Sequence, residues 1–223
     1  MIQFSLSDSP VPPVSASPGA RRGSAVRRLP WVVAVFLGVL AFASAAQARG
    51  WDPERPPSKE DQRHSLTVLL SAHHYRPDRA LLDQVGPDVN TVLVYLATDR
   101  RERPEVRRRA VTSLGLYPSD RTQRFLTGLL FERSLLGTPE GTLIRREALV
   151  ALARAFKGAV VDDLASLRHD ENPQVREACA RALGMTDSRS ALPILEAWLP
   201  HEQVLNTRLA VDEAYQHLIR EGR

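Results

Sequence analysis

The sequence predicts an all-α protein, a right-handed α-solenoid in which helical hairpins stack along one axis. First, a ten-residue pattern recurs at residues 106–115, 144–153 and 175–184, so successive copies begin 38 and then 31 residues apart. Second, a helix with apolar residues along one side is expected before each copy. Third, proline marks the turns between helices. A fixed repeat of this length is typical of stacked helix pairs.

The first residues have the features of a secretory leader. Arginines at 21, 22, 27 and 28 precede an apolar run at 31–43, and small residues follow at 46 and 48. This order is typical of a signal peptide. We therefore predict a signal peptide with an extended N-region at residues 1–48, cleaved after Ala48. The apolar run is shorter than the about 20 residues of a membrane helix, so an uncleaved anchor is the alternative.

The charge of the chain depends on this leader. The whole chain has 30 basic and 26 acidic residues, and residues 1–48 hold four Arg and one Asp, which leaves 26 basic and 25 acidic residues. A net charge of +1 gives no support for a nucleic-acid partner. The single cysteine, Cys179, cannot form an intramolecular disulfide and occupies the small apolar position of its copy. We expect an exported protein, periplasmic or extracellular.

The first part of the exported chain is predicted to be irregular. Residues 49–57 contain three Pro and one Gly, which indicates a linker. Ser58 opens a capping-box-like Ser-Lys-Glu-Asp, and we expect a helix from there to about residue 73. A break at 75–77 precedes a short helix at 78–85, and Gly86 and Pro87 form the next break.

The solenoid is predicted to span residues 58–223. Its expected repeats lie at 58–85, 87–115, 119–155, 158–184 and 188–219. The later first helices have apolar residues three and four apart, as one-sided helices do: Val89, Val92, Leu93, Leu96; Phe125, Leu126, Leu129, Leu130; Val160, Val161, Leu164, Leu167; Leu192, Leu195, Leu199. Pro104 and Pro173 open two of the second helices, where a missing N–H has no effect.

Two irregular places remain. A further step of 31 residues leads to a degenerate fourth copy that begins at Asn206, where we expect a terminal cap. The expected repeat at 119–155 carries an insert at 132–142 that is rich in Gly and Pro. We predict a surface loop there, with a partner contact as the alternative, because extra residues in repeat arrays map to one face.

Residues 167–184, Leu-Arg-His-Asp-Glu-Asn-Pro-Gln-Val-Arg-Glu-Ala-Cys-Ala-Arg-Ala-Leu-Gly, resemble a HEAT repeat of the short type seen in phycobilin-lyase-related proteins. The likeness covers about residues 87–219. It implies that a turn aspartate and an arginine six positions later join neighbouring repeats in a ladder. The positions concerned here are Asp170, Arg176, Arg107 and Arg145. In such folds the second helices line the concave side.

On a helix, the positions two before and two after the central alanine of each copy point away from the core. These columns are Arg108, Arg146, Glu177, Arg208 and Thr112, Val150, Arg181, Asp212. Guanidinium groups bind carboxylates at two points. The columns are therefore the candidate binding face for a protein or acidic peptide, and a solvated charged surface is the alternative.

The sequence gives no support for catalysis or a cofactor. The six histidines lack a metal-ligand spacing. HEAT-like deoxyhypusine hydroxylases hold iron through repeated His-Glu pairs, and this chain has one, at His201. There is no nucleophile elbow or phosphate loop. An arginine cluster at 100–109 would suit phosphates, but export and the low net charge argue against nucleic acid.

These features predict a non-catalytic scaffold that binds another protein or peptide through its second-helix face. A ligand-binding or lyase-like module is one alternative, and a structural spacer is the other. No metal or cofactor is expected, and contact with a membrane is expected only through an uncleaved leader.

Overall fold

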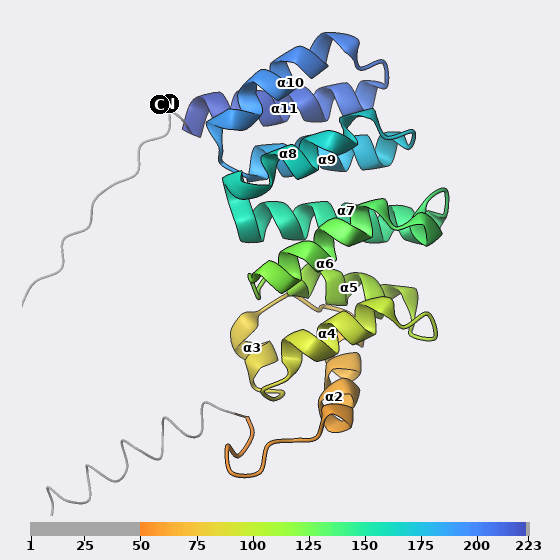
Figure 1. The fold of residues 1–223 in the computed structure, drawn as a ribbon, viewed down its shortest axis with the longest axis vertical. Helices are drawn as coiled ribbons and strands as arrows, with labels where there is room; N and C mark the ends of the chain where they lie inside the picture. Colours follow the sequence, from red (N-terminus) through yellow and green to blue (C-terminus); the bar gives the residue numbers. More distant parts are fainter. Residues whose placement is uncertain (1–49, 222–223) are drawn as a thin grey trace, which may run out of the picture. The chain divides into compact units, whose positions relative to one another are not determined.

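The computed structural model describes residues 50–221. The chain divides into two compact units, Met1–Ser44 and Ala45–Arg223, and the first lies outside the described residues. The predicted signal peptide, its cleavage after Ala48 and the membrane-anchor alternative also lie outside them. The second unit is all-helical within residues 50–221, which confirms the predicted fold class (Figure 1).

The second unit begins with two helices that precede the regular array. Helix α2 spans Lys59–Ser71 and opens with the predicted capping box, in which Ser58 and Asp61 each bind the other's backbone N–H. The short helix α3 spans Arg79–Asp83 and is capped by Asp78. The indole of Trp51 donates a hydrogen bond to the carbonyl of Asp83, 3.1 Å away, and so ties the start of this unit to α3.

Four helix pairs follow along the described chain. The first helices are α4 (Val89–Thr98), α6 (Asp120–Phe131), α8 (Val161–Ala165) and α10 (Leu192–Trp198). The second helices are α5 (Pro104–Leu114), α7 (Pro139–Phe156), α9 (Pro173–Met185) and α11 (Leu205–Glu221). Short 3₁₀ turns flank the later first helices: η1 (Arg133–Leu135), η2 (Lys157–Val160), η3 (Ser166–His169), η4 (Arg189–Ala191) and η5 (Leu199–His201).

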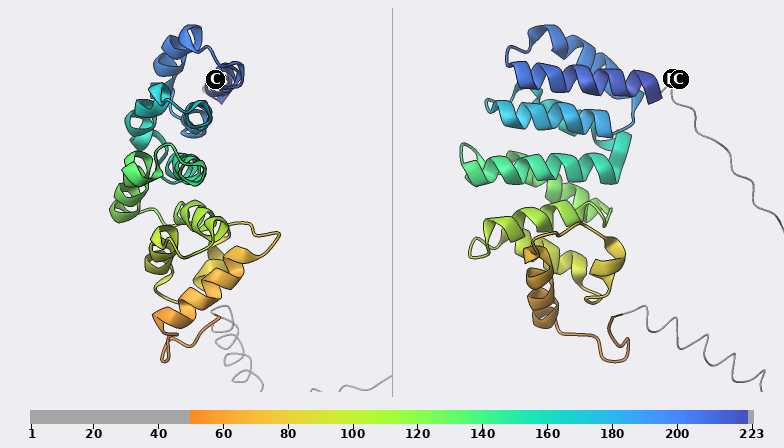
Figure 2. Two further views of the ribbon diagram at one scale, coloured as in Figure 1. Left: turned by 90° about the vertical axis from the view of Figure 1, so that its right-hand side faces the viewer. Right: turned by 180° about the vertical axis from the view of Figure 1, so that it is seen from behind.

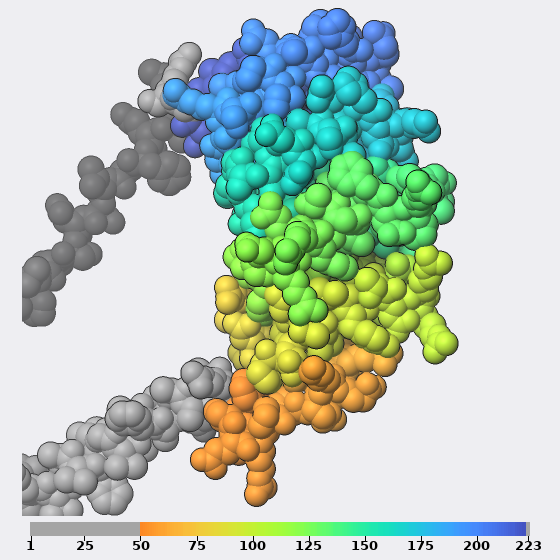
Figure 3. All heavy atoms as spheres, in the orientation of Figure 1, coloured from red at the N-terminus to blue at the C-terminus, as the bar shows by residue number. Residues whose placement is uncertain are grey.

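The first and second helices of this unit form two layers. Figure 2 shows the second helices α5, α7, α9 and α11 side by side in one layer. The largest contacts of α7, α9 and α11 are with the adjoining second helices, whereas α5 packs against both α4 and α7. The first helices form the other layer. In the space-filling view the pairs follow one another as contiguous bands in chain order (Figure 3).

The recurring ten-residue pattern forms the core between the layers. Its apolar positions are fully buried in each copy: Val106, Ala110, Leu114; Ile144, Ala148, Leu152; Val175, Cys179, Leu183. The thiol of Cys179 contacts the carbonyl oxygen of Leu164, and burial raises its pKa well above the ordinary value. Cys179 is therefore a core residue, as the pattern indicates.

The insert at 132–142 is only partly the loop that we expected. Residues 133–135 form η1, and α7 begins at Pro139, so the insert lengthens the second helix by several residues. Thr138 caps this helix and Pro139 opens it. Gly141 allows this arrangement because a Cβ at that position would overlap the backbone of Leu135. The glycine and proline that suggested a loop are part of a helix start.

Within residues 50–221, no helix is both long enough and apolar enough to cross a lipid bilayer.

Candidate functional site

One arginine near the start of each internal second helix forms an ion pair with a carboxylate of the following unit. The pairs are Arg107 with Glu140, Arg145 with Asp170, and Arg176 with Glu202. The arginine side chains are 9%, 4% and 16% exposed. Each also donates to a backbone carbonyl of its own unit, at Ala97, Leu130 and Asp170. We call these three pairs the arginine ladder.

Helix α2 supplies a further arginine at the start of the array. Arg63 lies 3.6 Å from a carboxylate oxygen of Asp99, in the turn between α4 and α5. A hydrogen bond from the backbone N–H of Arg101 lowers the pKa of Asp99. A hydrogen bond from Tyr95 and the positive charges of Arg63 and Arg101 lower it further. Helix α2 packs against α4 and α5, at a steep angle to the second helices, and Arg63 links it to the first turn of the array (Figure 2).

The last pair of the ladder has the most complete hydrogen bonding. Arg176 binds both oxygens of Glu202 through its Nε and Nη2 atoms, at 2.9 and 2.8 Å. The backbone N–H of Val204 and the indole of Trp198 also donate to this carboxylate. These donors, Arg176 above all, lower the pKa of Glu202 to about 2. Glu202 is thus a buried carboxylate that stays ionised.

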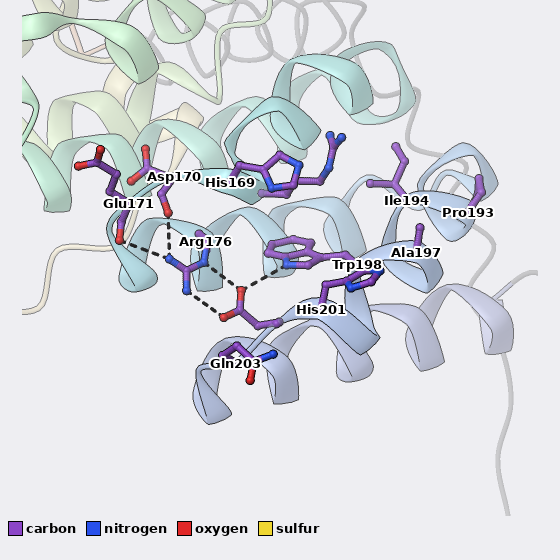
Figure 4. A pocket seen from close by; sticks show the side chains of 12 residues that line it. His169, Asp170, Glu171, Arg176, Pro193, Ile194, Ala197, Trp198, His201 and Gln203 are labelled. Atoms are coloured by element: carbon purple, nitrogen blue, oxygen red, sulfur yellow. Dashed lines mark hydrogen bonds and ion pairs between the residues drawn. The ribbon is translucent and has the colours of Figure 1, made fainter.

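A cavity of about 880 Å³ lies beside this pair, between the η3 turn and α10 (Figure 4). Arg176 and Glu202 neutralise each other at one end. The apolar side chains of Ile194 and Ala197 line the α10 side, and His169 and His201 bring two imidazoles to the cavity. The cavity can hold a small molecule, and of its lining residues only Asp170 and Arg176 were predicted from the sequence to have a role, as ladder residues.

The second-helix layer has its own hollow, of about 180 Å³, shared by α5, α7 and α9. Five of the predicted binding residues line it: Arg108, Arg146, Val150, Glu177 and Arg181. Leu143, Ala178 and Met185 add an apolar part, and Glu147 adds a carboxylate. We call these nine residues the second-helix hollow.

The charges of the second-helix hollow largely compensate each other. Glu147 lies 3.7 Å from Arg108 and accepts a hydrogen bond from Thr112, whose hydroxyl is 2.8 Å away. Arg181 pairs with Glu177 on the same helix, at 3.1 Å. The face is therefore a mixed surface with apolar side chains between ion pairs.

Comparison with known protein families found a match. A family model described as HEAT repeats matches residues 133–216, from the η1 turn after α6 to a point within α11. This match and the helical array of residues 50–221 fit a HEAT-like repeat protein. Arrays of HEAT repeats commonly act as scaffolds for protein interactions. No curated protein matches the chain.

The ladder of this HEAT-like array differs from the expected one in its partner atoms. Arg176 lies six residues after Asp170, as expected, but it binds the backbone carbonyl of Asp170. The carboxylate of Asp170 instead pairs with Arg145 of the preceding unit. All four predicted ladder residues take part in contacts between HEAT-like units. Each arginine, Arg107, Arg145 or Arg176, binds a carboxylate of the following unit, and Asp170 is one of these carboxylates.

The fourth HEAT-like copy is aligned one residue later than expected. Asn206, which that alignment puts at the first core position, is exposed, whereas the next residue, Thr207, is buried, as are Ala210, Val211 and Ala214. A Cβ at Gly184 would lie 3.0 Å from the Cβ of Ala214, just as one at Gly115 would lie 3.3 Å from that of Ala151. The register is thus set by the contact between α9 and α11.

This register removes two predicted residues from the binding columns. Leu209 and Glu213, not Arg208 and Asp212, match the columns, and neither Arg208 nor Asp212 lines the second-helix hollow. Arg208 instead matches Arg107, Arg145 and Arg176 of the arginine ladder. The sequence did not reveal this, because both alignments put a small or apolar residue at the central position.

The remaining polar groups give no metal site within residues 50–221. No group of three or more His, Cys, Asp or Glu side chains there could hold a metal ion. His73 and His74 follow the end of α2 and contact each other edge to face. In the arginine cluster at 100–109, Arg109 donates to the carbonyls of Leu70 and Ala72, which ties it to the end of α2.

Proposed function

We propose that this chain is a non-catalytic, exported scaffold that binds a segment of another protein through the second-helix hollow. The observation that carries the proposal is the convergence of α5, α7 and α9 on one concave spot with both apolar and charged groups. Protein interfaces combine apolar anchors with a charged rim in this way.

The chemistry of the hollow suggests what the partner segment contains. Leu143 is 39% exposed and offers, with Val150 and Met185, an apolar contact. The guanidinium of Arg146 has no hydrogen bond or ion pair within residues 50–221 that would compete with a ligand. A partner with one apolar side chain next to a carboxylate fits both features, and an acidic peptide is the simplest such partner.

The experiment compares two triple variants of equal charge. One carries Glu at Arg108, Arg146 and Arg181 in the second-helix layer. The control carries Glu at Arg121, Arg124 and Arg133, three exposed arginines at the first-helix layer and the insert. Each is used with the parent chain in crosslinking and affinity capture from an envelope fraction, after circular dichroism has shown equal helix content.

A protein captured by the parent and the control, but at least tenfold less by the second-helix variant, is the expected result. Equal capture by all three chains contradicts the proposed face and favours the spacer alternative. The export part is tested separately by sequencing the N-terminus of the chain recovered from the envelope. We expect Arg49 as the first residue, and a chain that keeps residues 1–48 inside the cell contradicts export.

A second candidate function is favoured by the cavity beside Arg176 and Glu202. Its volume of about 880 Å³ falls within the range of small-molecule sites. A ligand-binding module would retain a small molecule there. Native mass spectrometry of the purified chain tests this candidate, because a bound molecule adds a defined mass that is lost when Ala197→Trp fills the cavity.

A further inference from the structure

The last helix, α11, leaves the first half of its outer side uncovered. Leu205 is 58% exposed, Leu209 is 51% exposed and Val204 just before them is 38% exposed. The internal second helices have a further helix packed against the corresponding side: α7 covers α5, α9 covers α7 and α11 covers α9. Exposed apolar side chains grouped in this way mark contact sites.

Arg208 lies among these apolar residues and occupies the ladder position of α11. In the three internal units the equivalent arginines, Arg107, Arg145 and Arg176, each receive a carboxylate from the following unit. Within residues 50–221 the side chain of Arg208 forms no hydrogen bond or ion pair, and it is exposed. The ladder therefore ends on a donor that has no acceptor.

We infer that the first half of α11 is a docking site for a segment of a different protein, in which a carboxylate stands beside apolar side chains. The carboxylate binds Arg208 as Glu140, Asp170 and Glu202 bind their arginines, and the apolar side chains cover Leu205 and Leu209. This site is separate from the second-helix hollow and does not depend on the proposed function.

The second half of α11 limits the size of the occupant. Asp212 and Gln216 stand where the internal helices have apolar or small residues, such as Val111 and Gly115 in α5. A carboxylate and a long amide there prevent the close approach that a complete further helix pair requires. The occupant therefore covers only the first half of α11, as a turn with the start of a helix would.

A second copy of this chain fits the site poorly. The four carboxylates that bind arginines between its own units, Asp99, Glu140, Asp170 and Glu202, are already occupied within the same chain. The exposed apolar surface comes from only three side chains, while stable protein interfaces bury more than about 1,000 Å² in total. These ladder carboxylates are therefore not free to bind Arg208 of a second copy, and the occupant that fits the site is a segment of another protein.

The test uses a synthetic peptide with the sequence of residues 167–180, in which Ser replaces the cysteine. The peptide supplies Asp170 between Leu167 and Val175, the chemistry that the ladder recognises. It is titrated into the full chain labelled with ¹⁵N, up to millimolar concentration. We expect amide shifts confined to residues 204–212, which locate the peptide on the first half of α11.

Charge exchange makes the test specific. Arg208→Glu in the chain, or Asp170→Asn in the peptide, should each weaken binding at least tenfold. Arg208→Glu paired with a peptide carrying Asp170→Lys should restore it. Arg220→Glu, on the same helix near its end, should leave binding unchanged.

Three results overturn the inference. One is the absence of shifts at millimolar peptide. Another is binding that Arg208→Glu leaves intact. The third is a set of α11 shifts that appear on concentrating the chain alone, which identify a second copy as the occupant. None of these results bears on the second-helix hollow, so the two proposals fail independently.

Discussion

At the scale of single residues, Arg145 joins the two middle units of the array. Its side chain is 4% exposed, its Nε donates to the carbonyl of Leu130 at 2.8 Å, and its Nη2 pairs with Asp170. The neighbouring Arg146 is half-buried and has no such partner within the described residues. Two adjacent arginines thus have different roles, because one points into the contact between units and the other points to the second-helix hollow.

Replacing Arg145 by Ala should lower the free energy of unfolding by about 3 to 5 kcal/mol, because it leaves the Leu130 carbonyl without this donor and the Asp170 carboxylate without its positive partner, with only the backbone N–H of Asn172 still donating to it. Arg146→Ala should change it by less than about 0.5 kcal/mol. Urea unfolding followed by circular dichroism measures both. An equal, small effect of the two changes would show that the buried pair adds nothing to stability.

Glu202 should make stability depend on acid pH. Its pKa is about 2 in the folded chain and has an ordinary value of 4.5, so its contribution is complete above about pH 4.5 and is lost as the pH falls towards 2. By linkage the contribution is about 3 kcal/mol. The difference in unfolding free energy between the parent and Glu202→Gln should therefore shrink between pH 5 and pH 3. A difference that is constant with pH contradicts this assignment.

The arginines of the ladder could be predicted from the sequence, but their partners could not. Each arginine follows the first apolar residue of its copy, so the repeat itself reveals it. The partners lie 33, 25 and 26 residues further along the chain, because the units have unequal turns. No constant spacing links Arg107 to Glu140 or Arg176 to Glu202, and only the stacked structure brings them together.

At the scale of helices, close contact between second helices depends on small residues. A Cβ at Gly184 of α9 would lie 3.0 Å from the Cβ of Ala214 and 3.2 Å from its Cα in α11. The same position in α5 is Gly115, which approaches Ala151 of α7. Gly128 in α6 has nothing within 4 Å of its would-be Cβ. The close approach thus favours glycine at the first two positions, and glycine is optional at the third.

Gly184→Leu should destabilise the chain by about 1 to 3 kcal/mol or more, because the added side chain must push α11 away from α9. Gly128→Leu should instead stabilise it by up to about 0.8 kcal/mol, through the better helix propensity of leucine. The unfolding temperatures of the two variants and the parent test both predictions. Shifts of the same sign would show that helix propensity, rather than the contact with Ala214, governs both sites.

Helix existence was predicted well from the sequence and helix boundaries less well. Pro104 and Pro173 open α5 and α9 as expected, because proline suits the first turn of a helix. Pro139 opens α7 in the same way, but this helix start was not predicted, because the nearby Gly141 indicated a loop. A glycine in a helix is recognisable only when the neighbour that needs the space, here Leu135, is known.

At the scale of the whole helical array, residues 50–221, each helix pair is stabilised mainly by the pairs next to it. The larger packing contacts join helices of the same or of adjacent pairs. Arrays of this kind behave as nearly one-dimensional systems, in which a weak contact can separate the unfolding of the two sides. The Arg145–Asp170 contact lies near the middle of the array.

Two tryptophans can report on the two sides. Trp51 binds near α3, and Trp198 is buried in the fourth pair. In chains that retain only one of them, urea transitions should coincide in the parent background. In the Arg145→Ala background they should separate, with different midpoints. Coincident transitions in both backgrounds would mean that the array unfolds as one block regardless of this contact.

The burial of Cys179 has a consequence for how the folded chain meets oxidants. It is the only cysteine of the sequence, so no second thiol of the same chain can react with it. Its sulfur is enclosed in the core, and its raised pKa keeps it as the unreactive thiol. While folded, the chain can form neither an internal disulfide nor a mixed one with another protein. The thiol of Cys179 in the folded chain therefore stays reduced in a reducing and in an oxidising compartment alike.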